Sequence, residues 1–392
     1  MTIARGLVVA ASAAIVAGCS LFGGRDSTVE PPAELVDIEQ TLEIRRVWSA
    51  RVGRGTEGLR LGLRPATDGV HVYAGSYDGR VAALDGATGR TVWSVRTNAP
   101  LSAGPGYGNG VLVFGTSDGE LIALEADTGE ERWRVPVGSE VLAAPAVGGN
   151  VIALRSTDGR LRGFSITDGR EMWTVEHSQP ALIVRGDTKP EIAGQTVVAG
   201  FDNGRIGAYR LTSGEPLWEL AIGSPGGRSE LDRLVDIGGD MQVIGTDVYA
   251  VGYQGRAVNV DLQSGFVLWE QEMSSLAGLG VDARSVYVTS DVSYVLSLAR
   301  QNGIVQWTQE ALRLRDLTAP VRFMNTIVVG DFEGYLHFMD VDDGRFVARA
   351  RASSARIPTA PIIVGRNLVV QAEDGRIAAF SVVEEEPEEE RG

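Results

Sequence analysis

The chain has 392 residues, of which 44 % are hydrophobic and 22 % are charged, and this balance excludes a disordered or collagen-like chain. Its formal net charge of −15 argues against a nucleic-acid partner, because phosphate contacts require a basic face. The one membrane-type apolar run, residues 7–18, is too short to cross a bilayer as a helix.

The N-terminus has the order of an export signal. Arg5 supplies a positive charge, and the apolar stretch that follows ends in Val16-Ala17-Gly18-Cys19-Ser20. This ending resembles a bacterial lipobox, which predicts a signal peptide over residues 1–18 and a lipid on Cys19; a plain secretory signal is the alternative. Cys19 is the only cysteine, so an intramolecular disulfide is excluded. Ser20, where an Asp would resemble an inner-membrane retention signal, fits sorting to the outer membrane.

Polar segments are expected to flank the globular body. Residues 19–41 contain Pro31-Pro32 and scattered acids, and we expect them to form a lipidated, flexible tether. Residues 384–392 carry a run of glutamates and are predicted to be an acidic, disordered tail. A docking role of this tail for a basic partner is the alternative to a simple solvated end.

An internal repeat occupies residues 42–383. The stretch from Val72 to Trp93 returns as the stretch from Val111 to Trp133, with an Asp-Gly turn in the middle of each copy. Eight copies of this turn, one of them degenerate, recur with a mean period of about 42 residues, which is typical of propeller blades. Alternating apolar residues around each turn predict four strands per copy. We therefore expect an all-β fold, an eight-bladed β-propeller with four-stranded blades.

The tryptophans set the register of the repeat. All seven occupy one position, in the fourth strand of a blade: Trp48, Trp93, Trp133, Trp173, Trp218, Trp269 and Trp307. Packing between blades explains this pattern better than stacking on a ligand. Trp48 precedes the first full copy, whereas the last copy stops after its third strand, at Val383. An N-terminal strand is therefore predicted to complete the last blade and close the ring.

Two consecutive copies are longer than the others. The extra residues fall within 177–191 and 224–240, in connections between neighbouring blades, and topology places both on the face that carries the Asp-Gly turns. Loops on a rigid scaffold commonly carry function, so we interpret this pair as a binding surface; tolerated insertion is the alternative. Aliphatic side chains mixed with charged ones favour a protein partner.

Signals for catalysis are weak. His71, His177 and His337 occupy different repeat positions without metal-ligand spacing. The sequence contains no Gly-x-Ser-x-Gly motif, no phosphate-binding loop and no cysteine pair. Most carboxylates lie at repeat turns, where they bond turn backbone groups. We expect neither an enzyme nor a cofactor or metal site.

The repeat unit Gly-x-Leu-x-Ala-Leu-Asp-x-x-Thr-Gly-x-x-x-Trp resembles repeats of the pyrroloquinoline-quinone type. Together with the lipobox and the two long loops, the chain resembles the BamB family of lipoproteins of the β-barrel assembly machinery. This resemblance implies a non-catalytic scaffold, anchored through Cys19 on the periplasmic face of the outer membrane. It also implies docking to the periplasmic POTRA domains of BamA, among the other subunits of the assembly complex.

The resemblance also implies which residues contact the partner. In the first loop Leu182, Arg185 and Gly186 match the family pattern Leu-x-Leu-Arg-Gly, and Val184 replaces its second leucine. In the second loop the implied contacts are Asp232, Arg233 and Asp236, while Gly238 replaces a second acid of the pattern.

Two further hypotheses remain open at the level of sequence. The scaffold is a candidate to guide unfolded outer-membrane proteins by edge pairing with blade strands. Alternatively, the chain is a quinoprotein-like dehydrogenase or another ligand-binding periplasmic propeller, since propellers host many functions.

Overall fold

The computed structural model describes residues 30–383, except 181, 184–187, 224–225, 227–228 and 230–233. The chain divides into two units, Met1–Pro32 and Ala33–Gly392, and the second contains every strand described below. The predicted signal peptide, Cys19 and the acidic tail lie outside the described residues. Within the described part of the chain, no helix is long and apolar enough to cross a membrane.

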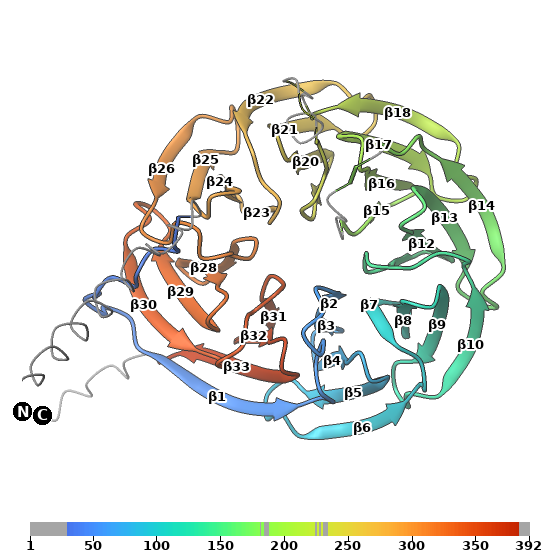
Figure 1. Cartoon of the computed structure of the whole chain (residues 1–392), viewed down its shortest axis with the longest axis horizontal. Helices are drawn as coiled ribbons and strands as arrows, with labels where there is room; N and C mark the ends of the chain where they lie inside the picture. The colour runs from blue at the N-terminus through green and yellow to red at the C-terminus, as the bar shows by residue number, and fades with distance from the viewer. Residues whose placement is uncertain are drawn as a thin grey trace, which may run out of the picture. The chain divides into compact units, whose positions relative to one another are not determined.

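Eight sheets are arranged in a ring, which confirms the predicted eight-bladed β-propeller (Figure 1). The first four blades, from the innermost to the outermost strand, have these bounds. Blade 1 consists of β3 (Ala66–Thr67), β4 (His71–Gly75), β5 (Arg80–Asp85) and β6 (Thr91–Arg96). Blade 2 consists of β7 (Leu101–Gly108), β8 (Val111–Thr116), β9 (Glu120–Glu125) and β10 (Glu131–Pro136). Blade 3 consists of β11 (Ala146–Gly148), β12 (Val151–Arg155), β13 (Arg160–Ser165) and β14 (Glu171–Glu176). Blade 4 consists of β15 (Glu191–Ala193), β16 (Thr196–Gly200), β17 (Arg205–Arg210) and β18 (Pro216–Ala221).

The other four blades follow the same order. Blade 5 consists of β19 (Gln242–Ile244), β20 (Asp247–Val251), β21 (Gly255–Asp261) and β22 (Val267–Met273). Blade 6 consists of β23 (Leu279–Val281), β24 (Ser285–Thr289), β25 (Val295–Ala299) and β26 (Val305–Gln309). Blade 7 consists of β27 (Val321–Phe323), β28 (Thr326–Gly330), β29 (Tyr335–Asp340) and β30 (Phe346–Arg351). Blade 8 consists of β31 (Ile362–Val364), β32 (Asn367–Gln371), β33 (Arg376–Val382) and, as its outermost strand, β1 (Ile44–Arg51).

Ring closure depends on β1, as the sequence predicted. This strand pairs antiparallel with β33, from Ile44 opposite Val382 to Arg51 opposite Arg376. One detail was not predicted: blade 2 has a fifth strand, because β2 (Gly62–Leu63) pairs parallel with β7. The segment between β1 and β3 therefore reaches the inner edge of blade 2.

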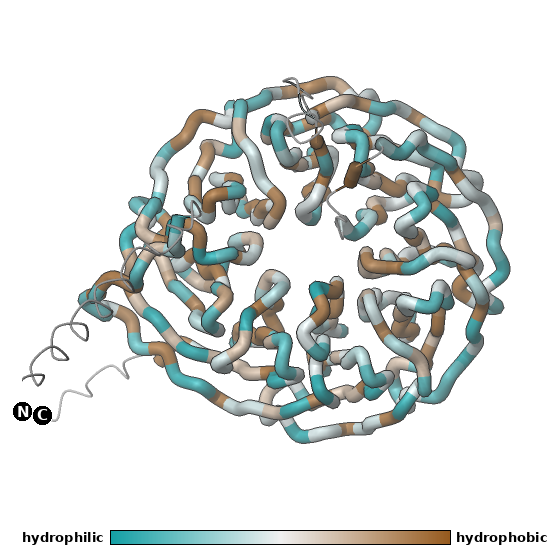
Figure 2. The backbone as a smooth tube through the Cα atoms, viewed as in Figure 1, coloured by the Kyte–Doolittle hydropathy of each residue, from teal (hydrophilic) through white to brown (hydrophobic). Residues whose placement is uncertain are grey.

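Burial along the strands explains their composition. Middle strands such as β8 are buried on both faces by the neighbouring blades, so both sets of alternating side chains are apolar. Outermost strands such as β6 alternate between exposed and half-buried positions. Figure 2 shows the resulting concentration of hydrophobic residues within the blades.

Each tryptophan joins its blade to the next one. The indole N–H of Trp173 on β14 donates to the carbonyl oxygen of Leu211, 2.8 Å away in blade 4, and the other six tryptophans make the same kind of bond at 2.8–3.0 Å. The ring also lies against Gly214 of the next blade, where an added Cβ would come within 2.7 Å of it. With a φ of +68°, Gly214 provides both the turn and the space for the ring. The predicted packing between blades is confirmed.

The segment 33–42 lies against the propeller, although the sequence predicted a flexible tether as far as residue 41. The N–H of Ala33 donates to the carbonyl of Arg313, and the N–H groups of Thr41 and Leu42 donate to the carbonyl of Val347. Leu42 also packs on the apolar cluster that contains Ala348. Residues 33–41 are therefore not a free tether, because apolar side chains and backbone bonds hold this segment on the propeller.

Candidate functional site

The two long loops are connections from the outermost strand of one blade to the innermost strand of the next. The first joins β14 to β15 over residues 177–190, and the second joins β18 to β19 over residues 222–241. They lie next to each other around the ring, in the sector of blades 3 to 5 (Figure 1). The predicted placement of both insertions on neighbouring blades is therefore observed.

Aromatic contacts fix the start of the first loop. The ring of His177 stacks on Phe201 with a centroid separation of 3.6 Å, and its Nε2 lies 2.8 Å from the hydroxyl of Tyr209. Burial lowers the pKa of His177, which favours the neutral ring. Two residues later, the side-chain amide of Gln179 donates to the carbonyl of Thr157 at 2.7 Å. This loop therefore leaves blade 3 in a defined direction.

Both ends of the second loop are attached to blade 5. Isolated bridges pair Gly223 with Gly255 and Asp236 with Tyr253, at the turn between β20 and β21. The side chains of Ile222 and Ile237 are fully buried beside these bridges.

The two loops are also bonded to each other. The buried Thr188 hydroxyl of the first loop donates to the carbonyl oxygen of Ile237 in the second. The backbone N–H of Lys189 donates to Oδ1 of Asp240 at 3.1 Å. The loops therefore form one surface, which we call the paired loops (residues 177–190 and 222–241).

Two of the residues that the sequence predicted as partner contacts lie in the described part of the paired loops. Leu182 is 42 % exposed, in a position that a partner can reach. Asp236 is fully buried, so its carboxylate does not face solvent in this structure. The other four, Val184, Arg185, Asp232 and Arg233, lie outside the described residues.

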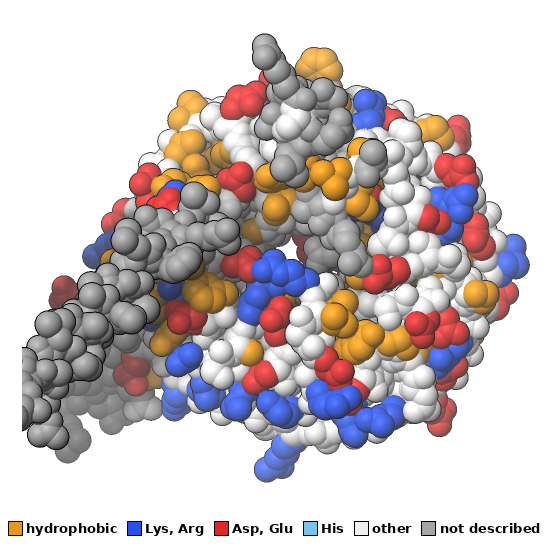
Figure 3. Space-filling model, viewed as in Figure 1, with side chains coloured by type: hydrophobic (Ala, Val, Ile, Leu, Met, Phe, Trp, Pro, Cys, Tyr) orange, Lys and Arg blue, Asp and Glu red, His pale blue; other side chains and the backbone are white. Residues whose placement is uncertain are grey.

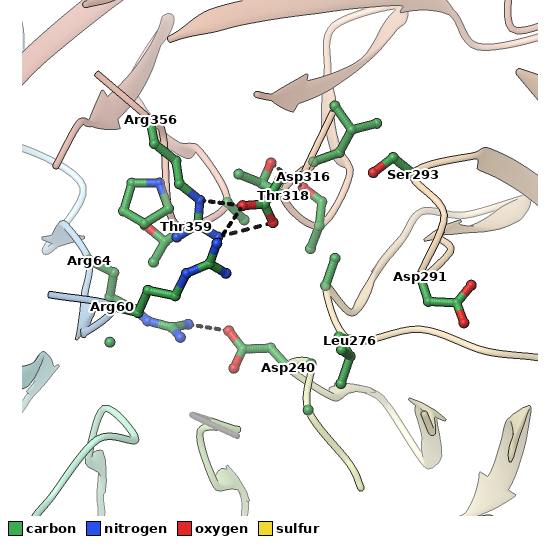
Figure 4. Close-up of a pocket in the computed structure, with 18 of the residues that line it drawn as sticks. Arg60, Arg64, Asp240, Leu276, Asp291, Ser293, Asp316, Thr318, Arg356 and Thr359 are labelled. Carbon is green, nitrogen blue, oxygen red and sulfur yellow. Dashed lines mark hydrogen bonds and ion pairs between the residues drawn. The ribbon is translucent and has the colours of Figure 1, made fainter. Parts of the chain in front are cut away.

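Gly238, which replaces an acid of the family pattern, is also described. A Cβ at this position would come within 2.7 Å of Leu276 Cδ2, so a longer side chain requires Leu276 to move. Two residues further on, Asp240 does carry a carboxylate, but that group points into the centre of the ring (Figure 4).

A cavity of about 450 Å³ opens at the centre of the same face, beside the second loop. Arg60 donates to Asp316 Oδ2 at 3.4 Å, Arg356 Nε lies 2.9 Å from the same oxygen, and Arg64 pairs with Asp240 (Figure 4). Figure 3 shows basic and acidic side chains next to one another around this centre.

The sequence did not predict this cluster of charged side chains, which consists of Arg60, Arg64, Arg356, Asp240 and Asp316. Arg60 and Arg64 precede the first full copy of the repeat, and Asp240 and Asp316 lie in connections between blades, so no repeat position marks them. Burial favours the protonated form of Asp240, but the charges of Arg64 and Lys189 outweigh it and hold the pKa of Asp240 below its usual value. Asp240 is therefore ionised and paired with Arg64.

The charged side chains of this cluster are paired with one another. Each of the three arginines in the cavity already has a carboxylate partner. Among the residues that the structure describes, no three His, Cys, Asp or Glu side chains are grouped so as to hold a metal ion. The paired loops, by contrast, form one surface because hydrogen bonds join the first loop to the second.

Comparisons with known proteins point to one family. A family model described as outer membrane protein assembly factor BamB matches residues 45–100 and 77–309. The protein of that name from Pseudomonas aeruginosa is 42 % identical over 372 residues, which cover 95 % of this chain and 97 % of that protein. The crystal structure of BamB from Moraxella catarrhalis is similar with a TM-score of 0.78 at 29 % identity, over 86 % of this chain and all of that one. The quinohemoprotein alcohol dehydrogenase from Comamonas testosteroni has a TM-score of 0.68 at 13 % identity, over 90 % of this chain and 79 % of that one, and this shows a likeness of fold alone.

Proposed function

This chain belongs to the BamB family of outer membrane protein assembly factors, and from that membership we propose that it is a non-catalytic scaffold subunit of the β-barrel assembly machinery. Its role is to dock on the periplasmic POTRA domains of the central subunit, BamA. The protein then acts at the periplasmic face of the outer membrane, together with the other subunits of the complex.

The observation that carries this proposal is the bonding between the two loops. Thr188 and Lys189 of the first loop bond Ile237 and Asp240 of the second, so a partner meets one preformed surface rather than two independent segments. Preformed surfaces bind with a smaller loss of conformational entropy.

Roles of individual residues follow from their positions. We assign the direct contacts to Leu182, Val184, Arg185, Asp232 and Arg233. Asp236 has a different role, because its side chain is buried and its backbone is bridged to Tyr253. It positions the second loop and does not itself touch the partner.

A lipid on Cys19 supplies the membrane anchor in this proposal. About 14 residues separate Cys19 from Ala33, where the chain meets the propeller, and they reach at most about 50 Å when extended. The anchor therefore keeps the propeller close to the membrane.

A pull-down from mild-detergent membranes tests the docking surface. The double variant Arg185→Glu, Asp232→Arg reverses two charges of the paired loops and leaves the buried Asp236 unchanged. The matched control is Arg170→Glu, which reverses an exposed arginine in the turn between β13 and β14, at the opposite end of the blade.

We expect the wild type and the control to bring down BamA, and the double variant to lose most of it. Equal recovery with all three would place the docking surface elsewhere on the propeller. Failure of the folded wild type to recover any outer-membrane barrel protein would overturn the scaffold function itself.

A further inference from the structure

A third long connection lies on the face of the paired loops. Residues 52–65 join β1, the outermost strand of blade 8, to β3, the innermost strand of blade 1, and this segment is as long as the first of the paired loops. Connections from an outermost strand to the next innermost strand share one face of a propeller. Segment 52–65 is therefore on the face to which the proposed function assigns docking.

Backbone bonds hold segment 52–65 on three blades. The N–H of Val52 donates to the carbonyl of Gly375 in blade 8 at 2.9 Å, and the carbonyl of Gly55 accepts from the N–H of Tyr77 in blade 1 at 2.8 Å. Near the end of the segment, β2 pairs with β7 of blade 2, and the side chain of Leu63 is buried there. The segment therefore has a fixed position on the ring.

Arg64 extends from this fixed segment to the second of the paired loops. Its backbone N–H donates to the carbonyl of Gly104 at 3.1 Å, directly after β2. Its guanidinium pairs with the carboxylate of Asp240 across the cavity (Figure 4). The two side chains are only 17 % and 27 % exposed, so salt and water screen this pair much less than a surface pair.

Asp240 is the residue at which segment 52–65 and both loops meet. Oδ1 of Asp240 accepts the backbone N–H of Lys189 from the first loop, and Oδ2 pairs with Arg64. The backbone of Asp240 also forms a parallel bridge with Gly278, directly before β23 of blade 6. One carboxylate of the second loop therefore joins the first loop to the fixed segment.

The charge of Arg64 keeps Asp240 in the form that makes these bonds. Burial raises the pKa of Asp240, and the charge of Arg64 is the strongest of the influences that lower it again. An ionised carboxylate accepts a stronger hydrogen bond than a neutral carboxyl group does. Loss of Arg64 would therefore weaken the bond from Lys189 together with the ion pair.

The bond from Lys189 is one of two adjacent contacts between the loops. The preceding residue, Thr188, donates to the carbonyl of Ile237, and the ammonium of Lys189 pairs with Glu191 at 2.9 Å, at the start of β15. The end of the first loop is thus aligned by neighbouring bonds to the second loop and to blade 4. A shift of Asp240 would disturb this alignment.

A second ion pair in the same cavity provides an internal comparison. Arg60 belongs to the same segment, and it donates to Asp316 at 3.4 Å. Asp316 lies in the connection between β26 and β27, outside the paired loops. The two pairs therefore share the segment and the cavity, but only the pair with Asp240 includes a residue of the paired loops.

We propose that Arg64 is a positioning residue for docking, which holds Asp240 from segment 52–65 and thereby sets the position of the paired loops on the ring. The docking site then consists of three connections rather than two. This inference rests on the proposed function, since it concerns the same surface. Arg64 acts through Asp240, and the direct contacts with BamA remain those assigned above.

The affinity of the full chain for BamA tests this role. Arg64→Met keeps the apolar stem of the side chain and removes its charge, and Arg60→Met is the matched control. Biolayer interferometry with full-length BamA in mild detergent measures the dissociation constant. We expect Arg64→Met to bind more weakly by about tenfold and Arg60→Met to bind like the wild type, because an exposed ion pair contributes little.

Folded variants that bind equally well would overturn the proposal. Equal losses in Arg64→Met and Arg60→Met would also overturn it, because they would assign the effect to the cavity as a whole.

A double-mutant cycle tests whether Arg64 acts through Asp240. Asp240→Asn keeps an acceptor for the N–H of Lys189 but removes the negative charge. We expect Arg64→Met to change the affinity much less in the Asp240→Asn background than in the wild type, because the interaction is already absent. Losses that multiply, as for independent sites, would show that Arg64 does not act through Asp240.

Hydrogen exchange of the chain without BamA separates this proposal from the proposed function. The backbone N–H of Lys189 is expected to exchange faster in Arg64→Met than in Arg60→Met, while β8 in the core of blade 2 exchanges at the same rate in both. Acceleration of β8 to the same extent would indicate a general loss of stability and would contradict the positioning role.

A wild type that fails to bind BamA would refute the proposed function, and exchange at Lys189 then decides alone whether Arg64 positions the loops. Faster exchange in Arg64→Met would support this positioning, and unchanged exchange would refute it.

Discussion

His337 is at the centre of a buried group of charged side chains in blade 7. The imidazole is fully buried, and its Nε2 lies 3.0 Å from Asp331 Oδ2. Arg349 Nε donates to its Nδ1 at 3.2 Å and also bonds the carbonyl of Val36 in segment 33–42. Because Nδ1 accepts a hydrogen bond, the ring is neutral and carries its proton on Nε2.

Acidification is therefore expected to weaken the fold through His337. Burial lowers its pKa below the ordinary value of 6.5, so the unfolded chain binds a proton that the folded chain does not. The stabilising contribution is complete above about pH 6.5 and declines as the pH falls below it. Thermal unfolding at about pH 7.5 and about pH 5.5 measures the effect.

The melting temperature of the wild type should fall more between these pH values than that of His337→Gln, which keeps a polar side chain but does not titrate. His177, whose pKa burial also lowers, contributes to the fall that remains in the variant. Equal falls in the two proteins would contradict the role given to His337.

At the scale of elements, the paired loops depend on a few bonds between them. Thr188→Val keeps the shape of the side chain but removes the donor to Ile237 O, which should cost about 1 kcal/mol of unfolding free energy. Hydrogen exchange should accelerate in both loops, including the second, which contains no substitution. Urea unfolding and exchange mass spectrometry measure the two effects.

Thr359→Val is the matched control. Thr359 is also buried, but its hydroxyl has no hydrogen-bond partner among the described residues, so the same substitution removes no bond. A similar loss of stability in both variants, or exchange limited to the first loop, would show that the bond does not couple the loops.

Ala348, in β30 of blade 7, occupies the repeat position that is a tryptophan in the other blades. The next blade, blade 8, has no continuous turn between its third and fourth strands, because β33 and β1 come from opposite ends of the chain. The glycine and carbonyl that receive a tryptophan in other blades are therefore missing. Thr41 and Leu42 bond Val347 in their place.

At the scale of the whole molecule, closure by β1 is the feature on which the ring depends. A chain that begins at Val52 lacks both segment 33–42 and β1, so the edge of β33 is left unpaired. Unpaired edges recruit other chains. We expect this variant to form oligomers or aggregates, as measured by size-exclusion chromatography with light scattering.

A peptide of residues 33–51 should restore the monomer, because it supplies the missing strand. A chain without residues 384–392 serves as the control and should stay monomeric. A monomeric truncated chain with the melting temperature of the full protein would show that closure by β1 is dispensable.

The sequence by itself determined the blades, the closure and the sector of the candidate site. The recurring tryptophan marked the fourth strand of each blade, and Trp48 before the first full copy marked the strand that closes the ring. This works because residues at the same position of a repeat take the same place in every blade. Only the tertiary structure decided that segment 33–42 is docked, that Asp236 is buried and that Arg64 pairs with Asp240. These features join residues at non-equivalent positions that are distant along the chain, so neither the period nor local propensity encodes them.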